Sequence, residues 1–144
     1  MGLVERVRHL LGGGAAERLE EATSSPERLK SLVLEMEILR LDLGTAVRDL
    51  LREREELESR GAAHEEEILA RERAIRKALL DEDEARTREA IQAKRAAFLA
   101  RSEIAARRAR LDERVGELEG DLAKLGDWAL RVRSARRESL LADE

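Results

Sequence analysis

The chain has 144 residues, of which 42% are charged, and its 28 basic and 32 acidic side chains give a formal net charge of −4. Only one tryptophan and one phenylalanine are present, so a thick globular core is excluded, because aromatic side chains supply much of the area that such cores bury. Both signs of charge are interleaved along the chain, which excludes the basic stripe of a nucleic-acid-binding protein. Cysteine is absent, which excludes disulfides and thiolate metal sites.

The residue types predict an all-α protein. Alanine, leucine, glutamate and arginine predominate, and these are strong helix formers, whereas β-branched residues are few. The apolar residues make up 42% of the chain and recur regularly, which argues against disorder. No apolar run approaches the roughly 18 to 20 residues that span a bilayer, and charges near the N-terminus interrupt any signal peptide. We therefore expect a cytoplasmic protein.

Residues 1–22 form the first predicted region, which opens with a short amphipathic helix. Its apolar residues share one face at helical spacing, and arginines lie at the flanks of that face. Such a helix can lie in a membrane interface with its basic residues near anionic headgroups. The alternative is that it packs on the rest of the chain or on another protomer. The candidate membrane-binding residues are Leu3, Val4, Arg6, Val7, Arg8, Leu10 and Leu11.

Two short segments punctuate the chain before its long helices. Three consecutive glycines predict an end or hinge after the first helix, because glycine loses much backbone entropy in a helix. Residues 15–22 are compatible with a resumed helix, and residues 23–25 are the predicted hinge and cap before the only proline. A capping box from Ser24 to Glu27 and an N-cap at Ser25 followed by proline both fit. The hinge and cap candidates are Gly12, Gly13, Gly14, Ser24, Ser25, Pro26 and Glu27.

After the proline, the pattern predicts two helices, at 26–80 and 85–140, with a tip at 81–84 and a tail at 141–144. Their near-equal length indicates a long antiparallel two-helix coiled-coil hairpin. This pairing places Met36 near Ala129 and Leu57 near Arg108. The predicted hairpin core follows the apolar stripe of each helix. It comprises Leu29, Leu32, Val33, Met36, Leu43, Leu50, Leu57, Ile68, Ile75, Ile104, Leu111, Val115, Leu118, Leu122, Leu125 and Val132.

Some features of the stripe predict looser packing and contacts outside the hairpin. Lys94, Arg101 and Arg108 occupy seam positions, so we expect their charged ends to reach water. Charges around residues 52–58 could pair across subunits or simply be solvated, and single exposed pairs contribute little. A further group of apolar residues falls outside the seam, which suggests contact with other copies. This group includes Ile38, Leu41, Leu51, Leu69, Ile91, Phe98 and Leu99.

Residues 25–37 read Ser-Pro-Glu-Arg-Leu-Lys-Ser-Leu-Val-Leu-Glu-Met-Glu, and a Glu-Leu-Glu follows at 117–119. Together with the opening Met-Gly-Leu and its amphipathic helix, this resembles the phage-shock protein A family, which includes the vesicle-inducing protein in plastids. The resemblance spans essentially the whole chain. Longer members continue with further helices after the hairpin, whereas this sequence stops at Glu144. The glycine triplet also shortens the first helix relative to the family.

The resemblance implies a bacterial ESCRT-III-like protein of the envelope stress response. Such a protein would polymerise, bind anionic lipids on the inner face of the cytoplasmic membrane, and remodel or protect that membrane. An alternative that the family also implies is a regulatory module that binds and inhibits a transcription-activating AAA+ ATPase. A generic coiled-coil spacer is the third hypothesis.

Catalysis and metal binding are not expected. His9 and His64 are far apart in the sequence, and no cysteine assists them. The glycine triplet lacks the Gly-Lys-Ser/Thr ending of a phosphate-binding loop. No nucleophile with an adjacent base is visible, so we expect no enzyme activity, no metal and no cofactor.

Overall fold

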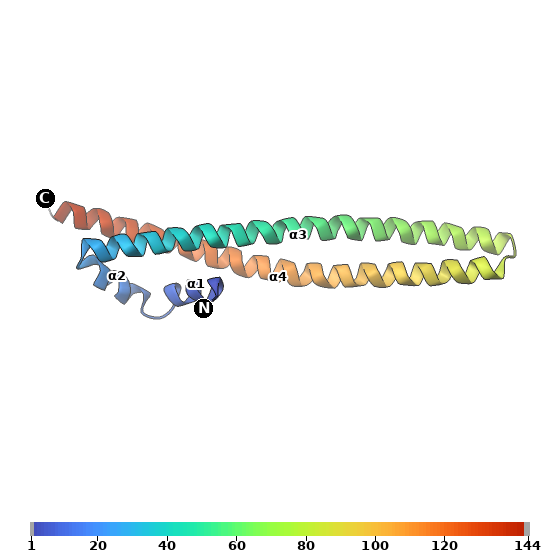
Figure 1. Ribbon diagram of the computed structural model, residues 1–144, viewed down its shortest axis with the longest axis horizontal. Coiled ribbons are helices and arrows are strands. Elements are labelled where there is room, and N and C mark those ends of the chain that lie inside the picture. The colour runs from blue at the N-terminus through green and yellow to red at the C-terminus, as the bar shows by residue number, and fades with distance from the viewer. Residues whose placement is uncertain (1, 143–144) are drawn as a thin grey trace. The chain divides into compact units, whose positions relative to one another are not determined.

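The computed structural model describes residues 2–142, and this range contains four helices and no strand. The two long helices, α3 and α4, pack against each other as an antiparallel hairpin (Figure 1), and two short helices precede them. The predicted fold class is therefore confirmed. The bounds are α1 Leu3–Leu11, α2 Ala15–Thr23, α3 Pro26–Leu80 and α4 Glu84–Ala142.

Helix α3 begins at the proline, and Ser25 is its N-cap. The backbone N–H of Arg28 donates to Ser25 Oγ at 3.5 Å. The Ser24 hydroxyl instead donates to the carbonyl of Glu21 at 2.6 Å, at the end of α2. Of the two caps that the sequence allowed, the structure therefore forms the one at Ser25, where the missing N–H of proline costs nothing in the first turn.

The turn between the long helices is shorter than predicted. Its backbone closes with the N–H of Asp83 donating to the carbonyl of Ala78 at 2.9 Å. Glu82, at the position that glycine usually takes in such a helix ending, has a φ of 53°. Asp83 then caps the next helix, because its Oδ1 accepts from the N–H of Arg86 at 3.1 Å. Helix α4 consequently begins at Glu84 instead of residue 85.

The far end of α4 also differs from the expected bounds. The helix continues to Ala142, so two residues of the predicted tail at 141–144 are helical. The rest of that tail lies outside the described residues. In the N-terminal region, α2 extends to Thr23, one residue beyond the predicted 1–22 segment, and it forms a separate helix after the glycines.

The chain divides into two compact units. We call Met1–Asp49 together with Val115–Glu144 the terminal unit, and Leu50–Arg114 the turn unit. The core of the terminal unit combines large side chains from α1, α3 and α4 with Ala22 of α2. Its buried apolar residues are Val7, Leu10, Ala22, Leu29, Leu32, Val33, Met36, Leu39, Leu43, Val47, Val115, Leu118, Leu125, Trp128, Ala129 and Val132.

The turn unit has a narrow seam. Its buried apolar residues are Leu57, Ile68, Ala78, Ala90, Ala97, Ile104 and Leu111. Ion pairs join the two helices beside this seam, and their partners show which residues of α3 and α4 lie opposite each other. Arg108 pairs with Glu58, with Nη2 and Oε1 2.6 Å apart, which is one residue from its expected neighbour Leu57.

Three predicted core residues are only half-buried, namely Leu50, Ile75 and Leu122. A hairpin of two helices covers a seam residue from one side, so part of its side chain can remain open to solvent. Ile75, for example, lines a surface depression together with Ile91 and Phe98. The other predicted core residues are buried.

Candidate functional site: the N-terminal helix and its docking surface

Helix α1 and the surface that it covers form the candidate site. Val7 is 0% exposed and Leu10 is 3% exposed, although both belong to a helix of only nine residues. The remaining apolar candidates, Leu3, Val4 and Leu11, are half-buried. In this structure, therefore, the apolar face predicted for membrane contact lies against the rest of the terminal unit.

Polar contacts place α1 beside α4 (Figure 1). Arg8 Nε lies 3.7 Å from Asp121 Oδ2, and Arg8 Nη2 lies 3.9 Å from Glu117 Oε2. Glu117 and Asp121 are four residues apart on α4, so one helical face presents both carboxylates to the same arginine. Arg8 and Arg6 are exposed, and so is His9.

Asp121 is the buried acid of the site, at 8% exposure. Its Oδ2 is enclosed and makes no hydrogen bond within the described residues. A buried charge is costly unless an opposite charge lies near it, and Arg8 of α1 supplies that charge. Sequence reasoning missed Asp121, because it adjoins the apolar stripe and its partner Arg8 is more than one hundred residues away in the sequence.

Trp128 marks the other end of the docking surface. It is 5% exposed, and it lines a cleft of about 430 Å³ together with Leu11, Gly12 and Gly14. Its indole Nε1 is enclosed and has no hydrogen-bond partner in the described part of the chain. The only tryptophan of the sequence therefore lies against the link between α1 and α2.

The predicted hinge glycines give this link its shape. Gly14 has a φ of +90°, a backbone conformation that residues with side chains rarely adopt. At Gly12 an added Cβ would lie 2.9 Å from the carbonyl oxygen of Arg8, which is too close. Gly13 has open space around it. Beyond the link, Arg18 Nη2 donates to the carbonyl oxygen of His9 at 2.8 Å, which ties α2 to the end of α1.

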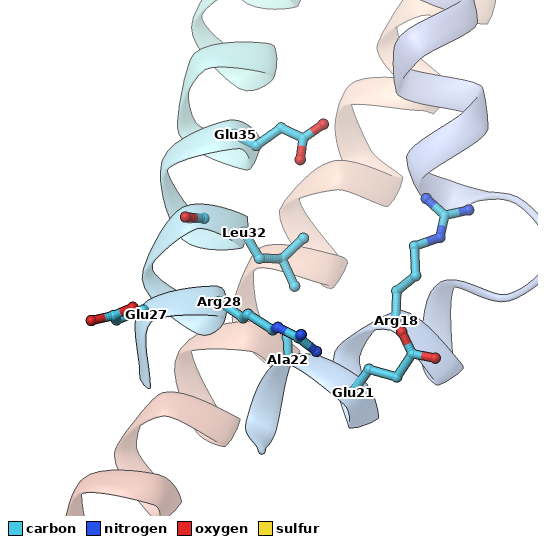
Figure 2. Close-up of a pocket in the computed structure, with 8 residues that line it drawn as sticks. Arg18, Glu21, Ala22, Glu27, Arg28, Leu32 and Glu35 are labelled. Carbon is cyan, nitrogen blue, oxygen red and sulfur yellow. The ribbon is translucent and has the colours of Figure 1, made fainter. Parts of the chain in front are cut away.

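A second cleft, of about 440 Å³ between α2 and α3, does not have the features of a binding site. Figure 2 shows Arg28 reaching across it from α3, Leu32 pointing into it and Glu27 pointing away. Arginines and glutamates together line it, including Arg18 and Glu21 from α2. Charges of both signs in a shallow cleft are typical of a solvated helix surface.

Among residues 2–142, no group of three or more potential ligands is placed to hold a metal ion. None of the helices described is both long enough and apolar enough to cross a membrane. His64 Nδ1 lies 3.6 Å from Glu67 Oε2 on the same helix.

No protein-family model, curated protein or solved structure matches this chain.

Proposed function

We propose that this protein is a self-assembling structural protein that associates with anionic membranes. The observation that carries the proposal is α1, a short amphipathic helix joined to a helical hairpin by three glycines. The resemblance to the phage-shock protein A family points in the same direction. In this proposal α1 contacts lipid, and the hairpin contacts further copies of the chain.

The apolar face of α1 suits a membrane interface. Fully burying a valine or leucine side chain contributes about 1.5 to 3 kcal/mol, and a bilayer interface provides such burial. Arg6 and Arg8 are exposed on the same helix, and each basic residue near an anionic leaflet contributes about 1 kcal/mol. One helix of this size binds weakly, so stable association requires several copies acting together.

Two exposed apolar surfaces support assembly. In the terminal unit, Leu34, Ile38 and Leu41 follow one face of α3, and each is more than half exposed. The spacing of four and three residues makes them neighbours on the helix surface. Such a row has no partner within the described chain and favours contact with another protein surface.

The second surface lies in the turn unit, where Ile91, Phe98 and Leu99 are exposed on α4. Lys94 and Arg95 line the same depression, and the guanidinium of Arg101 lies 4.7 Å from the centre of the Phe98 ring. This surface is apolar with a basic rim, whereas the row on α3 has the acidic Glu37 and Asp42 beside it. Different surfaces that meet head to tail generate rings or filaments.

Flotation on vesicles tests the membrane part of the proposal. The intact chain should float with phosphatidylglycerol vesicles and remain behind with phosphatidylcholine vesicles. Val7→Asp should abolish flotation, because it places a charge on the apolar face. His9→Asp is the matched control, since it adds an acid at an exposed position of the same helix. Failure of the intact chain to float, or equal loss in both variants, would overturn this part.

Light scattering on the purified protein without vesicles tests assembly. Large species whose size grows with protein concentration are expected. One small oligomer of fixed size at every concentration would contradict assembly and favour a coiled-coil spacer.

A further inference from the structure

We infer that the docking of α1 on α4 is an autoinhibitory latch that keeps the membrane-binding face closed until α1 leaves the hairpin. The inference rests on the proposed function and adds its regulation. It follows from the fact that Val7 and Leu10 are fully covered in the docked chain. The same side chains cannot be buried within the terminal unit and contact lipid at once, so the two states exclude each other.

The latch has an electrostatic component that is specific to the closed state. Arg8 faces Glu117 and Asp121 only while α1 is docked. When α1 undocks, water solvates the Asp121 carboxylate and Arg8 can bind an anionic headgroup. An anionic surface therefore competes directly with the two carboxylates for the guanidinium of Arg8. A neutral surface offers no such exchange.

The docking of α1 is also weak enough to be reversible. Arg8 and Glu117 have side chains that are 58% and 47% exposed, so their pairing is screened by solvent. Leu3, Val4 and Leu11 remain partly exposed in the docked chain. Docking therefore relies on few fully buried side chains, and an apolar surface that covers the whole face can displace it.

The glycine link lets α1 move alone. Helix α2 is anchored separately by Ala22, which is 6% exposed, whereas Gly12 and Gly13 are exposed. Gly14 holds its left-handed φ in the closed arrangement. Rotation about this link can carry α1 away, with loss of the Arg18–His9 hydrogen bond, while α2 and the hairpin keep their contacts with each other.

Trp128 provides a direct readout, because it is the only tryptophan and lies beside the link. In the intact chain without vesicles, acrylamide should quench its fluorescence weakly. Phosphatidylglycerol vesicles should raise the quenching constant severalfold, toward the value of a chain that lacks residues 2–14. Vesicle binding with Trp128 still protected would overturn the latch and leave the proposed function standing.

Charge reversal on α4 tests the latch without changing α1. Asp121→Lys repels Arg8 and should bind phosphatidylglycerol vesicles about tenfold more tightly, as expected if roughly one chain in ten is open without vesicles. Glu119→Lys is the matched control, because it makes the same change in net charge at an exposed position of α4. Equal gains in the two variants would contradict the latch.

A second pair of variants leaves the charge unchanged. Gly14→Ala strains the closed link at its positive φ and should both expose Trp128 and strengthen vesicle binding, whereas Gly13→Ala should do neither. Exposure of Trp128 in Gly14→Ala without any gain in binding would overturn the latch. If no chain, open or closed, binds vesicles, the proposed function itself fails.

Discussion

In the terminal unit the facing surfaces of α3 and α4 carry leucine, valine, methionine and tryptophan, whereas in the turn unit alanines occupy several of the buried positions. The turn unit instead carries ion pairs between its helices, such as Lys94 with Glu72 and Arg101 with Glu65. The residues Lys94, Arg101 and Arg108 were expected to reach water from the seam. They do so while pairing with the opposite helix.

This difference shows how one hairpin can serve two purposes. Large side chains in the terminal unit build a core wide enough to receive a third helix, and the docked α1 uses that width. In the turn unit Ala78, Ala90 and Ala97 fill seam positions with small side chains, and Phe98 lies exposed outside the seam. The first arrangement accommodates a docked helix within the chain, and the second leaves apolar side chains exposed on the outer side of the hairpin.

Replacing a core leucine by alanine should give the largest difference in stability between the two units. Leu43 is 0% exposed and Leu57 is 2% exposed. Leu43→Ala leaves a cavity enclosed by several helices, so we expect a loss near the upper end of the range of about 2 to 5 kcal/mol. Leu57→Ala should fall near the lower end, because a narrow seam can collapse onto alanine. Urea unfolding followed by circular dichroism measures both, and an equal or larger loss for Leu57→Ala would contradict the comparison.

Removing the backbone strain at Glu82 should change the free energy of unfolding less than a core truncation does, and should raise it. Glu82 has a φ of 53°, a conformation that costs a residue with a side chain roughly 1 to 2 kcal/mol. Glu82→Gly should therefore raise the free energy of unfolding by about 1 kcal/mol. Asp81→Gly is the control, because its φ is not positive and glycine there only adds backbone entropy to the unfolded chain. Destabilisation by Glu82→Gly in the same unfolding experiment would show that this turn carries no strain.

Loss of one ion pair should have the smallest effect. Arg108→Ala removes the pair with Glu58 and should cost about 0.2 to 1 kcal/mol in dilute buffer, since both side chains are nearly half exposed. The loss should fade at about 1 M salt, where the Debye length is about 3 Å. Arg110→Ala, at an exposed position of the same helix, is the control. A loss that persists at high salt would point to packing of the arginine stem instead of charge.

The sequence was sufficient to predict the fold because its signals are local and repeated. The proline start, the run of acids near the turn and the stripe that places Leu111, Leu118 and Leu125 seven residues apart act within single helices. The register followed from the similar length of the two arms. The charges around residues 52–58 were left open between pairing across subunits and simple solvation. The structure shows a third arrangement, in which Arg54 and Glu58 pair with Asp112 and Arg108 of the same chain.

The docking of α1 could not be predicted with the same means. Helical spacing shows that Val7 and Leu10 share a face, but it does not show what covers that face, and both alternatives remained open. Asp121 lies beside Arg8 of α1, and Trp128 lines a cleft with Leu11 and Ala15 from the N-terminal helices. A contact between residues more than one hundred positions apart leaves no periodic signal in one sequence. The one available hint is that Glu117 and Asp121 are four residues apart, so that both can face one basic residue such as Arg8.

Peptide-resolved hydrogen exchange, measured with and without phosphatidylglycerol vesicles, tests most directly the claim that α1 is shared between the hairpin and the membrane. We predict that residues 3–11 stay protected on vesicles, since α1 remains helical at the interface, while α4 around residues 117–131 exchanges faster after α1 has left. The turn unit should serve as an internal reference for changes that do not involve α1. Unchanged exchange in both segments, in samples where the chain is bound to vesicles, would contradict the account.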